Sequence, residues 1–244
     1  MTQFLFIILI INFIASTIFC TFGFGDALIA IPILSTFIPL KTATPYLNIT
    51  GLILTISIII KESRHLSWKD ALFLDIGSLC GVPIGIYVLK NADENNAKIG
   101  LGIVIIIISL FKLFYRNNVQ IKNDWWGLPF GFIGGILGGA FNCSGPAVVI
   151  YASLRQWEPK KFVSTLQAYF LPTNLFVFSG FLAKDLITFD VKKLVLLSIP
   201  GLLAAMFLGN ILNKKIKQEH FQKYIYYFLL LVGVILIVTS ALKK

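Results

Sequence analysis

Long apolar stretches separated by short polar loops make up most of this chain. Several of them approach the roughly 20 residues that a helix needs to cross a bilayer. They are residues 4–20, 42–60, 71–89, 100–114, 162–182, 194–209 and 224–242. The strands of membrane barrels are shorter and alternate in polarity, whereas these stretches are apolar throughout. The pattern therefore predicts an all-α polytopic membrane protein.

The two parts of the chain resemble each other at a nearly constant spacing. Residues 23–32 can be laid over residues 142–151, an offset of 142 − 23 = 119. At the same offset Asn48 meets Gln167, a carboxamide inside an apolar segment in both cases. We therefore predict a duplication, with a first membrane repeat at 1–118 and a second at 119–244. Five membrane segments per repeat, an odd number, would make the two repeats inverted.

The most irregular sequence of each half lies at matching places. In the first half it comprises Gly23, Phe24, Gly25, Asp26 and Ala27, and in the second Asn142, Cys143, Ser144, Gly145 and Pro146. A short apolar run follows each, residues 27–40 with Pro32 inside it and residues 147–154. Glycine permits unusual backbone turns, and proline suits the first turn of a helix. Each run is short for a crossing, so each predicts a broken or re-entrant half-helix that begins inside the protein.

Paired breaks of this kind favour a substrate site. Lipid cannot satisfy the backbone groups that a break frees, so the break must be buried in protein or line a polar cavity. Each half-helix offers unpaired backbone N–H groups and about half a positive charge at its N-terminus. A small anion is the natural ligand, bound by these N–H groups and the hydroxyl of Ser144. The alternative is a structural loop in which Asp26 and Ser144 cap the two helices.

Other polar and small residues within the spans extend this picture. Asn48, Gln167 and Asn174 should face the interior, where they either line the pathway or hydrogen-bond another helix. We include Asn48 and Gln167 among the substrate-binding candidates. Asp75 is expected to reach an interface or to be paired. Glycines at every fourth position from Gly127 to Gly139 predict close helix packing.

Composition supports a membrane class and excludes several others. Hydrophobic residues make up 57% of the 244 residues and charged residues 13%, too few for the surface of a soluble domain. The net charge of +10 arises mostly in short loops, which indicates contact with lipid headgroups and not nucleic acid. Three isolated cysteines, Cys20, Cys80 and Cys143, lack disulfide or metal spacing. We expect no cofactor and no metal. We also expect no catalytic residues, because no residue that could act as a base lies near Cys143.

The second break carries a resemblance to a known family. Gly139-x-x-x-Cys143-Ser144-Gly145-Pro146, together with the glycine-rich first break and its downstream proline, resembles the paired signatures of the sulfite exporter TauE/SafE family. The resemblance implies an integral membrane carrier of sulfur-containing anions such as sulfite, sulfonates or sulfoacetate. Asp26 departs from it, since the family's first break is usually richer in glycine there. Asp26 either caps the helix that begins at Ala27 or titrates and couples transport to protons.

We therefore predict a secondary transporter that moves a small sulfur-containing anion across the cytoplasmic membrane by alternating access. A passive anion channel of the same fold is the alternative. With five segments per repeat, the excess of Lys and Arg in alternate loops places both termini outside. Whether the chain forms a homodimer stays open.

Overall fold

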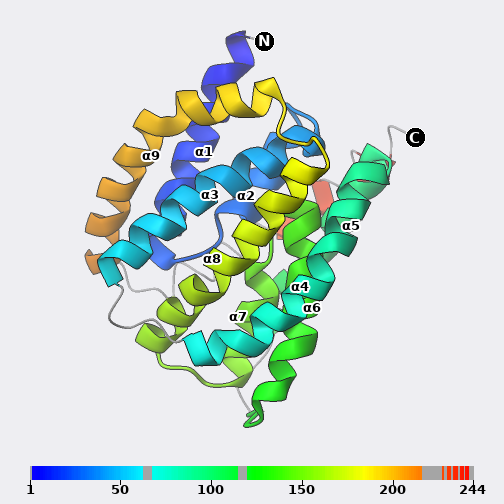
Figure 1. The fold of residues 1–244 in the computed structure, drawn as a ribbon. Coiled ribbons are helices and arrows are strands. Elements are labelled where there is room, and N and C mark those ends of the chain that lie inside the picture. Colours follow the sequence, from blue (N-terminus) through cyan, green and yellow to red (C-terminus); the bar gives the residue numbers. More distant parts are fainter. Residues whose placement is uncertain are drawn as a thin grey trace.

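The computed structural model describes residues 2–62, 68–114 and 120–215, together with the helical residues 227, 230, 231, 233–235, 237, 238, 240 and 241. In this part of the chain the regular structure is helical throughout. The elements are α1 (Thr2–Phe22), α2 (Asp26–Leu34), α3 (Leu40–Glu62), α4 (Trp68–Asn91), α5 (Glu94–Phe114), the short 3₁₀-helix η2 (Asp124–Trp126), α6 (Gly127–Phe141), α7 (Gly145–Leu154), α8 (Pro159–Ala183) and α9 (Phe189–Lys215) (Figure 1).

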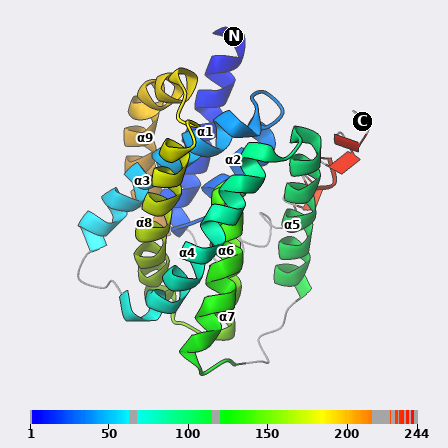
Figure 2. The ribbon, with the colours of Figure 1, turned by 45° about the vertical axis from the view of Figure 1, so that its right-hand side comes forward.

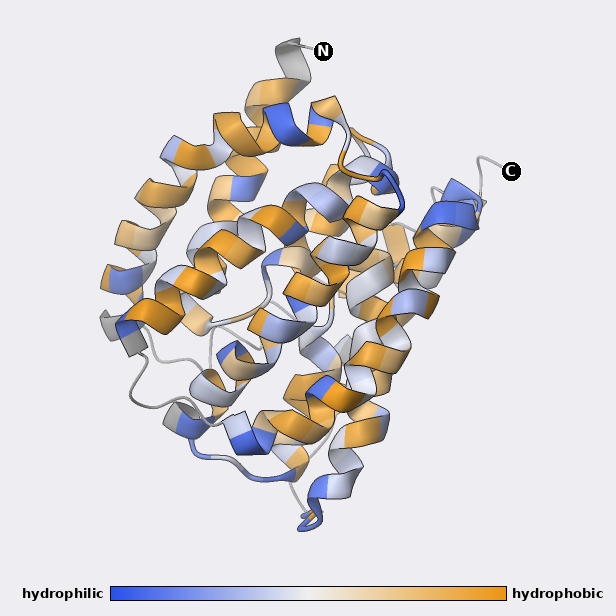
Figure 3. Ribbon diagram, viewed as in Figure 1, coloured by the Kyte–Doolittle hydropathy of each residue, from blue (hydrophilic) through white to orange (hydrophobic). Residues whose placement is uncertain are grey.

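Six of these helices are long and apolar enough to cross a membrane. The candidate spans are Leu5–Phe22, Leu40–Lys61, Trp68–Asn91, Glu94–Phe111, Lys161–Ala183 and Phe189–Asn213. Hydrophobic residues follow the lengths of these helices, and hydrophilic ones gather near their ends (Figure 3). Large apolar side chains such as Leu203, Phe207 and Ile107 are exposed on the outside, where they suit contact with lipid. The prediction of an all-α polytopic membrane protein is confirmed to this extent. About half of the apolar stretch 224–242 lies outside the described residues.

The order of elements in the second half follows that of the first. The short helices α2 and α7 begin at Asp26 and Gly145, which gives 145 − 26 = 119, and α3 and α8 begin at Leu40 and Pro159, again 119 apart. Helix α1 packs against α9, and α6 packs against α4 (Figures 1 and 2), so the first helix of each half contacts the fourth of the other. Helices α3 and α8 contact each other. The arrangement is compatible with the predicted duplication.

Helices α4 and α6 approach so closely that only glycine fits between them. Their facing glycines are Gly77, Gly81 and Gly85 on α4 and Gly131, Gly135 and Gly139 on α6. A Cβ at Gly81 would overlap the backbone carbonyl oxygen of Phe132, and one at Gly131 would overlap that of Leu74. The glycine pattern of α6 is thus confirmed as a packing surface. We refer to α4 and α6 together as the glycine-packed pair.

Replacing Gly81 with alanine should lower the melting temperature of the purified protein clearly. The added methyl group meets backbone, which cannot rotate away, so we expect the upper end of the ~1–3 kcal/mol typical of overpacking. Gly100→Ala on α5 is the matched control, because no atom lies within 4 Å of the Cβ position there. Thermal unfolding of both variants in detergent checks this. Equal melting temperatures would show that the glycine-packed pair is not tight.

Candidate functional site

A break separates α1 from α2 and another separates α6 from α7, and each contains residues with left-handed backbone. In the first, Gly23 (φ 82°) and Gly25 (φ 99°) turn the chain from α1 into α2. Glycine adopts these angles without steric cost. In the second, Asn142 (φ 54°) ends α6, and asparagine tolerates this region better than most residues. The short helices begin slightly earlier than predicted, at Asp26 and Gly145.

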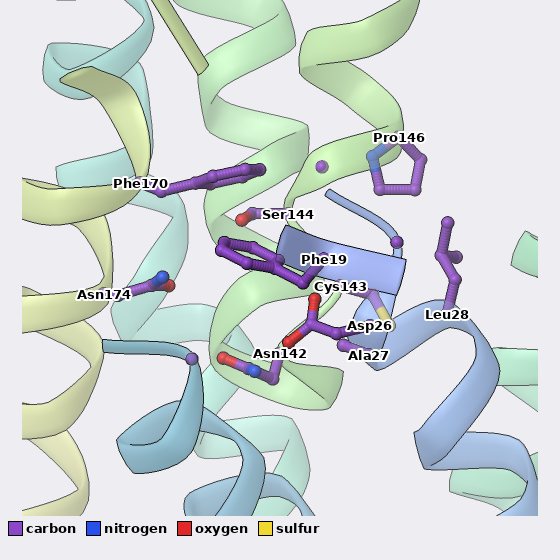
Figure 4. Close-up of a pocket in the computed structure, with 13 residues that line it drawn as sticks. Phe19, Asp26, Ala27, Leu28, Asn142, Cys143, Ser144, Pro146, Phe170 and Asn174 are labelled. Carbon is purple, nitrogen blue, oxygen red and sulfur yellow. The ribbon is translucent and has the colours of Figure 1, made fainter. Parts of the chain in front are cut away.

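A pocket lies between the N-termini of α2 and α7 (Figure 4). The space between its lining atoms, with open solvent at the mouth included, is about 370 Å³. The lining residues come from five helices and the two breaks: Phe19, Gly25, Asp26, Ala27, Leu28, Gly51, Asn142, Cys143, Ser144, Gly145, Pro146, Phe170 and Asn174. The pocket thus joins segments from both halves of the chain.

Most of the residues proposed from sequence line this pocket. They are Gly25, Asp26, Ala27, Asn142, Cys143, Ser144, Gly145 and Pro146. The other four, Gly23, Phe24, Asn48 and Gln167, are not among its lining residues. Phe24 is instead packed edge-on against Phe162. The remaining three, Gly23, Asn48 and Gln167, take part in hydrogen bonds to the two breaks.

Asn48 and Gln167 each hold the break of the opposite half. Asn48 Nδ2 donates to Asn142 Oδ1 at 3.2 Å and to the Asn174 carbonyl at 3.5 Å. Gln167 Nε2 donates to the Gly23 carbonyl at 2.9 Å. Since Asn48 and Gln167 are 119 residues apart, as are Gly23 and Asn142, these are equivalent contacts made crosswise. We call them the crossed carboxamide contacts.

Asp26 is buried, with 9% of its surface exposed, and its carboxylate interacts with the backbone N–H groups of Asp26 and Ala27. The prediction that it caps a helix beginning at Ala27 needs correction. Gly25 is the N-cap, and Asp26 is the first residue of α2, because the left-handed turn at Gly25 brings the chain into the helix one residue early. The carboxylate nevertheless meets the free amides of this helix end.

Ser144 occupies the N-cap of α7, but its hydroxyl makes no capping hydrogen bond to the helix. The alternative in which Ser144 caps α7 is therefore wrong. Its backbone is in the helical region, which points the side chain away from the following amides, and Pro146 occupies the first turn. The hydroxyl lies at the pocket (Figure 4) and can serve a ligand there.

Sequence reasoning left five lining residues out of the site: Phe19, Leu28, Gly51, Phe170 and Asn174. Asn174 carried a signal as a polar residue in an apolar span. Gly51 and Phe170 could have been found together, because 170 − 51 = 119 places them at equivalent points of the two halves. Phe19 and Leu28 look like any other apolar residue of a membrane helix, and nothing in the sequence marks them.

The chemistry of the lining suits a small solute held by hydrogen bonds. Donors include the backbone at the two helix N-termini, the Ser144 hydroxyl and the amide groups of Asn142 and Asn174. Of the lining residues, only Asp26 carries a charge. Phe19 and Phe170 supply apolar walls (Figure 4). Among the described residues, no group of His, Cys, Asp and Glu could hold a metal ion.

Comparison with known proteins places the chain in a family. No solved structure matches it. It is 26% identical over 265 residues to "Probable membrane transporter protein YunE" of Bacillus subtilis (strain 168), covering 93% of this chain and 95% of that protein. The model of the family described as "Sulfite exporter TauE/SafE" matches residues 8–236. Both descriptions are of membrane transport, which supports a multi-pass membrane transporter and confirms the resemblance seen in the sequence. Because the family match spans nearly the whole chain, the protein belongs to the sulfite exporter TauE/SafE family.

Proposed function

We propose that this protein carries a small sulfur-containing oxyanion, of the sulfite, sulfonate or sulfoacetate type, across the cell membrane. One observation carries the proposal: the short helices α2 and α7 direct their N-termini at a single pocket. A helix N-terminus attracts anions through unpaired N–H groups and its partial positive charge. Two such termini acting on one ligand favour an anion over a cation or a neutral solute.

In the proposed binding mode, backbone N–H groups make most of the contacts with the anion and side chains make fewer. Amide groups at Gly25–Ala27, which the Asp26 carboxylate occupies while it is ionised, and those of Ser144, Gly145 and Ala147 would surround the oxyanion, helped by the Ser144 hydroxyl. Since the lining residues include no Lys or Arg, we expect modest affinity, which allows release. The name of the family supports the sulfur-containing class of ligand, and the two helix N-termini at the pocket support a binding place there.

The proposed mechanism is alternating access between two inverted repeats, residues 1–118 and 119–244. The crossed carboxamide contacts support it, because each repeat holds the break of the other and the two breaks can move together. In this scheme both termini lie outside the cell. Asp26 repels the anion while ionised and admits it when protonated, which couples anion movement to protons.

Purified protein can test this directly. Thermal-shift binding is measured with sulfite, thiosulfate, sulfoacetate, taurine and sulfate, and we expect at least one sulfur-containing anion to stabilise the protein. Flux into proteoliposomes should saturate and be accelerated by the same anion on the opposite side. Flux that follows the membrane potential without saturating would indicate a passive anion channel instead. Stabilisation by a cation or a neutral solute alone would contradict the anion proposal.

A further inference from the structure

A row of hydroxyl groups leads from the pocket to a second carboxylate, Asp75 on α4. The Thr173 hydroxyl donates to Asp75 Oδ1 at 3.2 Å. Thr173 and Ser78 have their hydroxyl oxygens 2.9 Å apart, and either can be the donor. Ser78 also donates to the backbone carbonyl of Asp75 at 2.8 Å. Asp75, Thr173 and Ser78 thus form one hydrogen-bonded group between α4 and α8.

Tyr169 connects this group to the pocket. It is fully buried on α8, one turn before Thr173, and its hydroxyl has those of Ser78, Thr173 and Ser144 as neighbours. None of them is at standard hydrogen-bond geometry to it, so the Tyr169 oxygen has no fixed partner. Buried hydroxyls normally find one. The three neighbouring hydroxyls can supply it, and Ser144 lines the pocket.

The backbone around Tyr169 is shaped to admit its hydroxyl. A Cβ on Gly134 of α6 would lie 2.7 Å from the Tyr169 oxygen and 3.4 Å from the carbonyl oxygen of Ser144. The absence of a side chain there leaves room for the Tyr169 hydroxyl beside the backbone of Ser144. We call Asp75, Thr173, Ser78, Tyr169 and Ser144 the hydroxyl row.

The charged groups around Asp75 leave it without an ionic partner. None of the ion pairs among the described residues includes it. On α8, Tyr169 faces it and Lys161 pairs with Asp70 at 2.9 Å; α6 carries no titratable residue. On the other packed elements, Asp124 of η2 pairs with Arg155, Lys61 of α3 donates to Asn210, and Lys41 is exposed near the start of α3. Asp26 belongs to the pocket itself. An unpaired carboxyl within a membrane span is costly and indicates a function.

We propose that Asp75 sets the direction of the hydroxyl row, and so decides whether Ser144 donates a hydrogen bond to an anion in the pocket. This inference rests on the proposed function. When Asp75 holds a proton, it donates to Thr173, and each hydroxyl turns toward the next until Ser144 donates into the pocket. When Asp75 is ionised, Thr173 donates to it, the other hydroxyls reverse, and Ser144 presents an oxygen lone pair.

Each hydroxyl keeps its own proton in this scheme and only rotates. The proton that Asp75 gains or loses is exchanged with water, so no other reactant is needed. Hydrogen bonds to an ionised acceptor are stronger than neutral ones. Anion binding and protonation of Asp75 therefore favour each other, although Asp75 does not touch the anion. Asp75 is a positioning residue.

The test measures sulfoacetate affinity against pH in an Asp26→Asn background, which removes the repulsion of the pocket carboxylate. Sulfoacetate keeps a constant charge between about pH 6 and about pH 9. Over this range we expect affinity in the background variant to fall about tenfold, the equivalent of one lost hydrogen bond to a charged group. Adding Asp75→Asn should remove the fall, because an amide does not titrate. Adding Asp70→Asn, on the same helix but outside the row, should keep it.

A second pair of variants tests the link through the Thr173 hydroxyl and leaves the Asp75 carboxylate unchanged. Thr173→Val keeps the shape of the side chain but interrupts the row, so it should also flatten the pH profile, whereas Thr173→Ser should preserve it. This pair also decides the matter if Asp75→Asn fails to fold.

Four outcomes would overturn the inference. A flat profile in the Asp26→Asn background, or an unchanged fall after Asp75→Asn or Thr173→Val, would do so while leaving the proposed function intact. Failure of the wild-type protein to bind sulfoacetate or any other anion tested would remove both.

Discussion

Replacing Gly51 with leucine will abolish anion binding while the protein still folds. Gly51 lines the pocket on α3, and the Cβ of any larger residue would start 3.6 Å from Asp26 Oδ2 and 4.0 Å from Asn142 Nδ2. The leucine side chain beyond that Cβ must occupy the space between the two helix N-termini. Leucine is also a better helix former than glycine, so α3 should not be weakened. We expect no thermal shift with any anion that stabilises the wild-type protein.

Gly51→Ala is the matched control for that variant. A Cβ at 3.6 Å is in ordinary van der Waals contact, so alanine fits without moving Asp26. Its binding should remain within a few-fold of the wild type, and both variants should elute from size exclusion as the wild type does. Full anion binding by a folded Gly51→Leu protein would show that the ligand sits somewhere else.

Replacing Asp26 with asparagine will strengthen anion binding at high pH. Two like charges about 4 Å apart repel by about 4 kcal/mol at an effective dielectric constant of about 20. Even a third of that repulsion corresponds to about tenfold in affinity. Asparagine keeps an oxygen that can accept hydrogen bonds from the amides of α2, so the start of the helix should survive. We therefore expect affinity at least about tenfold higher than in the wild type, measured by titration with a radiolabelled sulfonate.

The size of this effect depends on pH. At pH values low enough to protonate Asp26, the wild-type pocket has no charge at this position, and the two proteins should bind equally. As the pH rises and Asp26 ionises, wild-type affinity falls, whereas that of Asp26→Asn falls less. Asp190→Asn, an exposed position in the first turn of α9, serves as the control and should follow the wild type. If Asp26→Asn leaves both transport and its pH dependence unchanged, Asp26 has no part in coupling.

The breaks could be predicted from sequence because their residue types are constrained locally. Positive φ angles at Gly23 and Gly25 favour glycine, Asn142 suits the left-handed end of α6, and Pro146 suits the first turn of α7. These backbone requirements involve only a few neighbouring residues, so they can be recognised in the sequence. The start of α2 was placed one residue late, since Asp26 resembles an N-cap while Gly25 performs that role.

The partners across the molecule could not be predicted in the same way. Asn48 was expected either to line the pathway or to bond another helix, and sequence could not choose between a ligand and Asn142. Phe19 and Phe170 become pocket walls only through the packing of α1 and α8 around the breaks. The glycines of α6 predicted close packing, but their facing row, Gly77 to Gly85 on α4, depends on which helix meets α6. Such features arise from tertiary contacts between distant segments.

The central claim is that one anion binds between the N-termini of α2 and α7. Anomalous diffraction from crystals grown with selenite tests it most directly, because selenium replaces sulfur in an oxyanion of the same shape and marks its position. The account predicts a selenium peak within hydrogen-bonding distance of the backbone amides near Asp26 and Gly145 and of the Ser144 hydroxyl, and no such peak in Gly51→Leu crystals. A peak at another place in the protein, or the same peak in Gly51→Leu, would contradict it.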